Sequence, residues 1–250
     1  MGESERIGRP IVIKALHKSF GDQTVLNGID LAVERGETLA ILGRSGTGKS
    51  VLLKLIIGLQ EPDSGSIRIH GQEINGLALD ELNEVRKKVG FLFQYAALYD
   101  SLTVEENVAF PLKRHAALSA GEQKERVREL LSSVGMEQHW EKMPSKISGG
   151  MQKRVGLARA LALEPDILLF DEPTAGLDPI TAREIGELIL GLQEQRKRAC
   201  IMVTHDIPNA KTVSDRLALM DGGDILAEGT FKDLQESRNE FVAQFLRNAF

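Results

Sequence analysis

The apolar residues in the first hundred positions of this chain gather into short runs, which polar or glycine-containing turns separate. Runs of this length predict buried β-strands when turn residues bound them. Two intervening segments carry apolar residues at helical spacing: 49–57, which Gly58 ends, and 79–88. The expected strands are 11–16, 25–33, 37–42, 66–70 and 89–93.

The middle of the chain has a different pattern. From 103 to 163 apolar residues recur at helical spacing with almost no strand pattern, most clearly over 122–134. Strand patterns then return, with a helix expected at 180–194 and strands at 166–170, 200–203, 217–220 and 224–228. Apolar strands that alternate with helices are typical of a largely parallel sheet buried on both faces. The sequence therefore predicts an α/β fold that a helical insertion of about sixty residues interrupts.

Composition narrows the classes of function. The 250 residues carry a net charge of −5 without a dense run of Lys or Arg, which argues against nucleic acid as the main partner. Cys200 is the only cysteine, so an internal disulfide and a cysteine-rich zinc site are excluded. The N-terminus lacks the features of a secretory signal, and no stretch approaches the ~20 apolar residues of a membrane-spanning helix. We therefore expect a cytoplasmic chain that reaches a membrane only through partners.

A glycine-rich segment follows the expected strand 37–42. Residues 43–50, with the sequence GRSGTGKS, match the pattern G-x-x-x-x-G-K-[ST] and lie between a strand and a helix, as that pattern requires. The glycines let backbone N–H groups turn toward phosphate oxygens, and the helix N-terminus adds a positive dipole. In such a loop Lys49 reaches the β- and γ-phosphates and Ser50 binds Mg²⁺. A dinucleotide-binding loop is excluded, because it would require glycine in place of Val51.

The expected strand 166–170 ends at two carboxylates, at the edge where open α/β sheets bind ligands. Asp171 is a candidate for holding Mg²⁺, directly or from the second shell. Glu172 follows it and is placed to orient and deprotonate an attacking water. Alone, Asp-Glu-Pro would be an ordinary turn after a strand. After a phosphate loop in the same sheet, it predicts nucleotide hydrolysis.

From about residue 11 to residue 234 these patterns resemble the ATP-binding-cassette (ABC) ATPase family, and Ser148-Gly149-Gly150 resembles that family's signature. The resemblance implies a P-loop NTPase (RecA-like) fold with a mainly parallel sheet, an antiparallel β portion and an inserted helical subdomain. It implies one nucleotide-binding domain over 1–250, with the core at about 10–94 and 164–230, the helical subdomain at about 95–163 and a helical tail at 231–250. It also implies a homodimer in which the signature of one subunit binds the γ-phosphate of ATP held by the other.

The resemblance assigns further roles. Gln94 matches a glutamine that senses metal and water, Asp178 matches a residue that communicates across the dimer, and His205 matches a histidine that contacts the γ-phosphate. Phe20 matches an aromatic residue that stacks on adenine, with a core position as the alternative. The implied catalytic residues are Glu172, His205, Gln94 and Lys49, and the implied Mg²⁺ ligands are Ser50, Gln94 and Asp171. The implied ATP contacts are Phe20, Gly43, Arg44, Ser45, Gly46, Thr47, Gly48, Lys49, Ser50, Val51, Ser148, Gly149, Gly150 and Asp178.

Two positions depart from the family pattern: Ile147 stands where Leu is usual, and Met151 where Gln is usual. The glycines between them are retained, so we expect ATP binding across the dimer to survive. Together with FQYAALY at 93–99 and VEENVAFPL at 104–112, the run SGGM is similar to the ATPases of Mla/Mce-type transporters, which move phospholipids between bacterial membranes. None of these runs encodes lipid recognition.

This narrower resemblance implies a position on the cytoplasmic face of the inner membrane and two copies of a transmembrane permease. It also implies a periplasmic MCE lipid-binding protein and, in some systems, a STAS-domain subunit. A permease helix would dock in a groove lined by Tyr95, Leu98, Tyr99 and Leu102, with burial inside the insertion as the alternative. Two other functions stay open: the ATPase of a small-solute importer, and a soluble ABC ATPase that acts on nucleic acid or ribosomes. The apolar stripe at 240–250 would dock on the core or on a neighbouring subunit.

Overall fold

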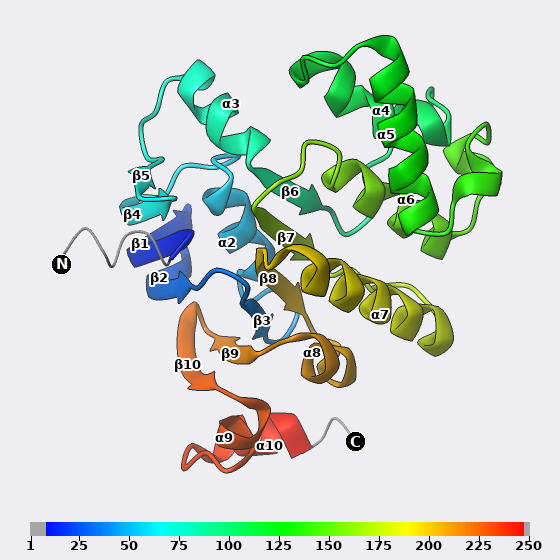
Figure 1. The fold of residues 1–250 in the computed structure, drawn as a ribbon. Coiled ribbons are helices and arrows are strands. Elements are labelled where there is room, and N and C mark those ends of the chain that lie inside the picture. The colour runs from blue at the N-terminus through cyan, green and yellow to red at the C-terminus, as the bar shows by residue number, and fades with distance from the viewer. Residues whose placement is uncertain (1–8, 248–250) are drawn as a thin grey trace.

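Two β-sheets face each other in the computed structural model, which describes residues 9–247 (Figure 1). The smaller sheet is antiparallel, in the order β2-β1-β4-β5. Its strands are β1 (Ile11–Phe20), β2 (Gln23–Val33), β4 (Ser64–Ile69) and β5 (Gln72–Glu73). The larger sheet has the order β10-β9-β3-β8-β7-β6, and it is parallel except for the hairpin of β9 and β10. Its strands are β3 (Thr38–Leu42), β6 (Val89–Leu92), β7 (Ile167–Asp171), β8 (Ala199–Thr204), β9 (Arg216–Asp221) and β10 (Asp224–Gly229).

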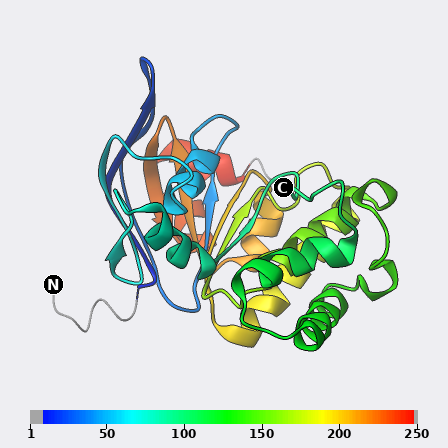
Figure 2. The same ribbon diagram turned by 90° about the horizontal axis from the view of Figure 1, so that it is seen from above.

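The helices fall into three groups. The first contains α2 (Lys49–Ile56) and α3 (Leu79–Lys87), which lie beside the antiparallel sheet. The second is the insertion between β6 and β7, drawn in green to one side of the sheets in Figure 2, with α4 (Val104–His115), α5 (Ala120–Ser133), the short η1 (Glu137–His139) and η2 (Pro144–Lys146), and α6 (Gly149–Ala160). The third contains α7 (Pro179–Arg196), α8 (Ile207–Val213), α9 (Phe231–Gln235) and α10 (Glu240–Arg247). No helix within 9–247 is both long and apolar enough to cross a membrane.

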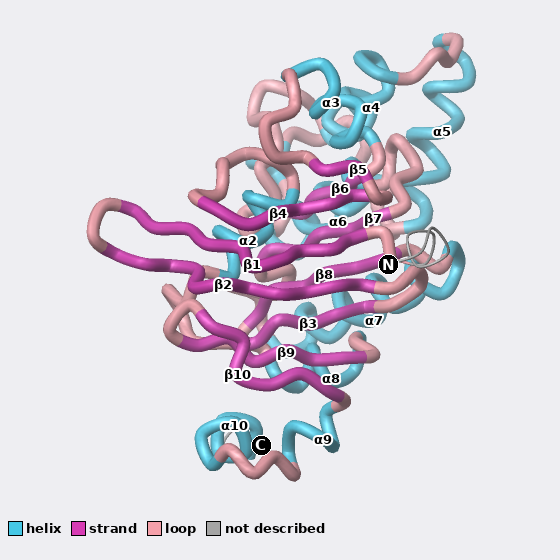
Figure 3. The backbone as a smooth tube through the Cα atoms, turned by 90° about the vertical axis from the view of Figure 1, so that its left-hand side faces the viewer, coloured by secondary structure: helices cyan, strands magenta, loops and turns pink. Residues whose placement is uncertain are grey.

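The central strands of the large sheet are buried on both faces, and alternate side chains enter two cores. Leu39 and Ile41 of β3 pack with α2 and the antiparallel sheet, whereas Ala40 and Leu42 pack with α7, α8 and the insertion. Each fully buried Leu or Ile contributes about 1.5–3 kcal/mol relative to an exposed one. The two cores therefore hold β3, β7 and β8 rigidly, and this fixes the positions of the C-terminal ends of these strands. Figure 3 shows these strands stacked side by side, with the β1–β2 hairpin extending beyond them.

The predicted parallel sheet and helical insertion are confirmed, but several boundaries were wrong. The first strand extends to Phe20 rather than ending at residue 16, because Ala15 adopts a φ of 43° and shifts in register let polar residues continue the pairing with β2. The elements β5 and α8 were not expected. The helix that follows Ser148 begins at Gly149, because the Ser148 side chain caps it.

The tail packs on the core of its own chain. Val242, Ala243 and Leu246 of α10 are buried, and Val242 and Leu246 belong to the core that α7 and α8 cover. The Arg44 guanidinium lies 5.5 Å from the Phe241 ring centre, so α10 also contacts the glycine-rich loop after β3. Within one chain the stripe therefore packs on the core, and its docking on a neighbouring subunit stays a prediction. Phe250 lies outside the described residues.

Candidate active site

The glycine-rich loop 43–48 connects the fully buried strand β3 to α2. Gly46 and Gly48 have φ angles of 83° and 97°, in the left-handed region that favours glycine. A Cβ on Gly48 would lie 2.8 Å from the Val25 carbonyl oxygen, so a larger residue does not fit there. Within the described chain, no side chain caps α2 and its first turn contains no acidic residue. Its first N–H groups are therefore available to an anion.

Lys49 is 5% exposed and folds back over the loop. Its Nζ donates hydrogen bonds of 2.9 Å to the carbonyl oxygens of Gly43 and Arg44. The Lys49 Nζ also lies 3.9 Å from Glu172 Oε1. Burial lowers the pKa of Lys49, and the charges of Glu172 and Asp171 oppose that shift. A bound phosphate would offer this ammonium a stronger acceptor than the two carbonyls.

Ser50 and Asp171 meet across the sheet, because the carboxyl ends of β3 and β7 lie at the same edge with only β8 between them. The Ser50 hydroxyl donates a 2.6 Å hydrogen bond to Asp171 Oδ1. A hydroxyl and a carboxylate form an oxygen ligand set that suits Mg²⁺, which usually binds one or two protein groups together with phosphate oxygens and water. The residues present therefore fit this ion.

Glu172 adopts a φ of 47°, which is unusual for a residue with a side chain. Its backbone N–H donates to the Val203 carbonyl oxygen at 2.9 Å. Its Oε2 lies 2.9 Å from Nδ1 of His205 and accepts a 3.3 Å bond from the His205 backbone N–H. The Glu172 carboxylate thus lies between the Lys49 ammonium and the His205 imidazole, beside the glycine-rich loop.

A cavity of about 280 Å³ lies between β1, β2, the glycine-rich loop, the start of α2 and the segments that follow β6 and β7. Phe20, at the end of β1, is 47% exposed and forms one wall, so it is not a core residue. The remaining lining residues are Val25, Ser45, Gly46, Gly48, Lys49, Ser50, Val51, Gln94 and Glu172. A larger hollow of about 610 Å³ lies elsewhere, but its charged residues include Arg216 paired with Glu37 and Glu228, and it contains no part of the loop. The 280 Å³ cavity is therefore the better candidate for a phosphate ligand.

Three residues predicted to contact ATP shape the loop rather than line this cavity. The Thr47 hydroxyl donates to the Arg44 carbonyl oxygen at 3.0 Å, while the Arg44 side chain turns toward Phe241. A Cβ on Gly43 would lie 2.3 Å from the Met220 carbonyl oxygen, which holds the start of the loop against β9.

The remaining four predicted ATP contacts lie apart from the cavity of this chain. Ser148 caps α6 by accepting a 3.3 Å bond from the Met151 N–H, and Gly149 and Gly150 form the first turn. A Cβ on Gly150 would lie 2.5 Å from Cγ2 of Thr181, so this helix end packs against the start of α7. Asp178 caps α7 through bonds from Ile180 N–H, Thr181 N–H and the Thr181 hydroxyl.

Apart from the 280 Å³ cavity, an apolar groove of about 440 Å³ lies between β6, α4 and α6. Tyr99 lines it, with its ring 4.6 Å from that of Phe110. The other residues expected in a partner groove lie differently: Tyr95 is 83% exposed outside the lining, and Leu98 packs against the core. Leu102 is also absent from the lining, so Tyr99 is the one expected residue that lines this groove, together with residues of β6, α4 and α6.

Sequence analysis missed Lys153 of α6, which is 5% exposed. Its Nζ donates to the backbone carbonyl oxygens of Gln94 and, at 3.1 Å, Glu172. Burial lowers its pKa to about 8, and the charges of Asp171 and Glu172 oppose this. The available signal was spacing: Lys153 lies three residues from both Gly150 and Gly156, on the face where α6 can approach its neighbours closely.

Comparisons with known proteins agree with this geometry. Residues 26–175 match the family model described as ABC transporter. The chain is 41% identical over 240 residues to the "Probable ribonucleotide transport ATP-binding protein mkl" of Mycobacterium leprae, an alignment that covers 96% of this chain and 69% of that protein. It is 42% identical over 226 residues to the methionine import ATP-binding protein MetN of Rhizobium johnstonii, covering 90% of this chain and 61% of MetN.

The fold is similar to a dimeric, post-hydrolysis structure of the ATP-binding cassette MJ0796 bound to ADP and Pi. The TM-score is 0.81 at 35% identity, over 88% of this chain and 98% of MJ0796.

Proposed function

The chain belongs to the ABC transporter family and is an ATPase, and we propose that it works as a homodimer with both ATP sites at the subunit interface. The separation of the two phosphate-binding elements supports this proposal. Residues of the loop and Glu172 line the cavity, whereas Ser148 and the two glycines after it lie outside its lining, with Gly150 against Thr181 of α7. A second copy facing the first would bring its own signature to the open side of the cavity. The related cassette MJ0796 is dimeric when it holds ADP and Pi.

The residues of one chain divide the chemistry between them. Ser50 and Asp171, with Gln94 lining the same cavity, would hold Mg²⁺, which when bound neutralises charge on the phosphates. Lys49 would exchange its carbonyl acceptors for phosphate oxygens. Glu172 would accept the proton of the attacking water, since its carboxylate lines the cavity. His205 orients that carboxylate through the 2.9 Å contact with its Nδ1 and would contact the γ-phosphate.

ATP hydrolysis by the dimer would drive a membrane permease. A permease helix would dock in the groove beside Tyr99 and Phe110. ATP binding would close the dimer and draw the two insertions together, a shift of population toward the closed state. The chain would then lie on the cytoplasmic face of the inner membrane.

For the cargo, we favour phospholipids. The runs FQYAALY, VEENVAFPL and SGGM, which resemble Mla/Mce-type ATPases, support this choice. A small-solute importer is the second candidate, because MetN, named for methionine import, matches at 42% identity. The name of mkl adds ribonucleotides as a cargo to test.

Purification of the tagged chain from detergent extracts of its native membrane tests the proposal. We expect a permease in one-to-one ratio, an MCE protein and bound phospholipid by mass spectrometry, and a STAS-domain subunit in those systems that contain one. Phe110→Arg should lose the permease, because it places a charge in the apolar groove. Leu79→Arg, which changes an exposed apolar residue on α3, is the matched control and should retain it.

Other copurifying partners would contradict parts of the proposal. A solute receptor with methionine or a ribonucleotide would move the cargo to the importer class and leave the ATPase assignment intact. Ribosomes or nucleic acid without a permease would reject the transport role.

A further inference from the structure

Lys153 connects the signature helix of this chain to the chain's own catalytic strand end. Its Nζ donates to two carbonyl oxygens that belong to different elements, Gln94 after β6 and Glu172 after β7. Both residues also line the 280 Å³ cavity. The ammonium therefore joins three segments at one buried point.

The rest of the same helix face supports this connection. The Arg159 guanidinium donates to the carbonyl oxygens of Ala96 and Ala97 at 2.6 and 2.7 Å. Between the two cations, Gly156 lets α6 approach β6: a Cβ there would lie 2.8 Å from Leu92 Cδ1 and 3.2 Å from Ala96 Cβ. The turn after Gln94 is thus held by α6 along two helical turns.

The N-terminus of α6 is held just as closely. Gly150 contacts Thr181, whose hydroxyl binds the Asp178 carboxylate at the start of α7. Ser148, Gly149 and Gly150 are consequently one helical turn from Lys153 on a single rigid element.

We propose that Lys153 is a positioning residue that makes Glu172 of one ATP site and the signature offered to the other ATP site move as one body. The inference rests on the proposed homodimer. In that assembly, displacement of the signature by the partner's nucleotide would pass through α6 to the backbone of Glu172 and Gln94.

The backbone of Glu172 shows why such a support is needed. Its φ of 47° lies in a region that residues with side chains avoid, and such a conformation persists only when its surroundings fix it. Three bonds hold it: the N–H donates to the Val203 carbonyl oxygen, and the Glu172 carbonyl oxygen accepts from Lys153 Nζ at 3.1 Å and from the Ala175 N–H at 3.2 Å. Removal of the ammonium would leave the Glu172 and Gln94 carbonyls without this partner and loosen the direction of the carboxylate.

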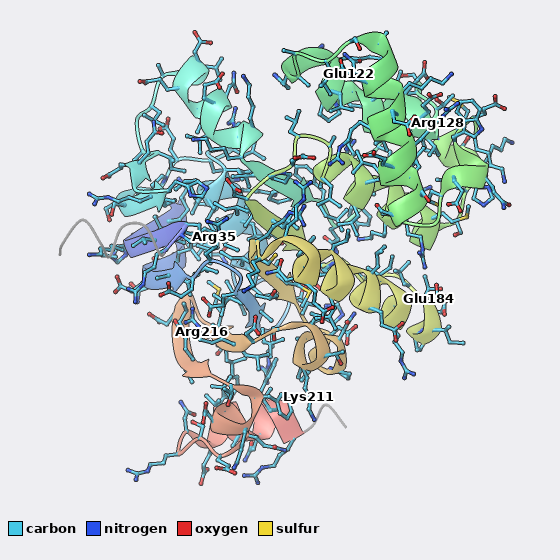
Figure 4. The ribbon with its side chains drawn as sticks, in the orientation of Figure 1. Arg35, Glu122, Arg128, Glu184, Lys211 and Arg216 are labelled. Carbon is cyan, nitrogen blue, oxygen red and sulfur yellow. The ribbon has the colours of Figure 1, made fainter. Side chains whose placement is uncertain are left out.

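The neighbouring residue on α6 provides a matched control. Arg154 carries the same charge, but it donates to Val134 and, at 2.9 Å, to Glu184 of α7, which Figure 4 labels on the outer part of that helix. Its loss would weaken the packing of α6 against α7 without changing a bond to the cavity residues.

The test separates ATP binding from ATP cleavage in the purified chain. A fluorescent ATP analogue reports affinity, and single-turnover cleavage of bound ATP reports the chemical step. We expect Lys153→Met to slow cleavage about tenfold or more, as misplacement of a catalytic group does, with affinity unchanged within about twofold. Lys153→Arg should recover most of the rate, because a guanidinium can bind both carbonyls. Arg154→Met should keep both values near those of the wild type.

Wild-type cleavage by Lys153→Met would overturn the inference, and so would equal losses in Lys153→Met and Arg154→Met, which would indicate general loosening of α6. If Lys153→Met does not fold, hydrogen exchange of Lys153→Arg and Lys153→Gln replaces it. The Gln variant alone should exchange faster at 94–97 and 172–175, and equal protection in both would reject the role. The homodimer is tested separately, by measuring how the wild-type rate depends on protein concentration. The comparison between variants is made at one concentration, so its outcome does not depend on that measurement.

Discussion

Two helices of this chain begin at glycine-rich segments suited to anions, and they are equipped very differently. At α2, Gly48 leaves the N-terminus without a side-chain cap, Lys49 and Ser50 line the same cavity, and Ser50 is hydrogen-bonded to Asp171. At α6, the Ser148 hydroxyl occupies one N–H group, and the first turn lies against Leu177 and Thr181. Neither helix start has an acidic residue in its first turn.

This difference indicates that the two helix N-termini have different roles in the proposed reaction. In the proposed mechanism the α2 site supplies the groups that hold and attack a phosphate, and its open side would receive a further donor. The α6 site provides backbone donors and no reacting group of its own. Each is half of a site, which is why a dimer is the simplest way to complete both.

The largest expected effect comes from the catalytic carboxylate of the α2 site. Glu172→Gln keeps the size and the hydrogen bond to His205 but cannot accept a proton, so turnover should fall about 10²–10⁴-fold, as loss of a general base does. ATP affinity should persist, and a closed dimer should accumulate in ATP. Phosphate release and light scattering measure the two results. Turnover near that of the wild type would remove Glu172 from the role of base.

The α6 site is tested by a bulky substitution at its cap. Ser148→Arg should leave ATP affinity of the single chain unchanged, because this residue does not line the cavity of its own chain. Hydrolysis should fall about a hundredfold, comparable with the loss of a transition-state hydrogen-bond donor. Ser148→Thr, which preserves an N-cap hydroxyl, should retain most activity.

Mixed dimers sharpen this test. A dimer with Ser148→Arg in one chain should lose one of its two sites, whereas full activity would show that the signature is not shared between subunits. The steady-state rate of purified mixed dimers, compared with both homodimers, decides between these outcomes.

The sequence was informative where local pattern and topology agree. Apolar runs and turn residues predicted the central strands. The loop after β3, which leads to Lys49, and the strand end at Asp171 and Glu172 were expected at one edge, because parallel strands present their carboxyl ends there. The short elements β5 and α8 carry too few residues for a periodic pattern. Lys153 was missed because a lysine on a helix usually points to solvent, and only packing against Gln94 and Glu172 reveals its burial.

The smallest expected effect concerns the base of the nucleotide. Phe20 forms a wall of the cavity and is 47% exposed, so its ring is available for stacking, and Lys18 Nζ lies 5.3 Å from the ring centre. Phe20→Ala should weaken ATP binding about tenfold, within the range measured for stacking of a base on an aromatic ring, and leave the cleavage rate of bound ATP unchanged. Phe20→Tyr should bind normally because it keeps the ring. Equal loss of affinity for ATP and for inorganic triphosphate in the Ala variant would mean that Phe20 supports the phosphate loop, not adenine, and the α2 site would then read phosphate alone.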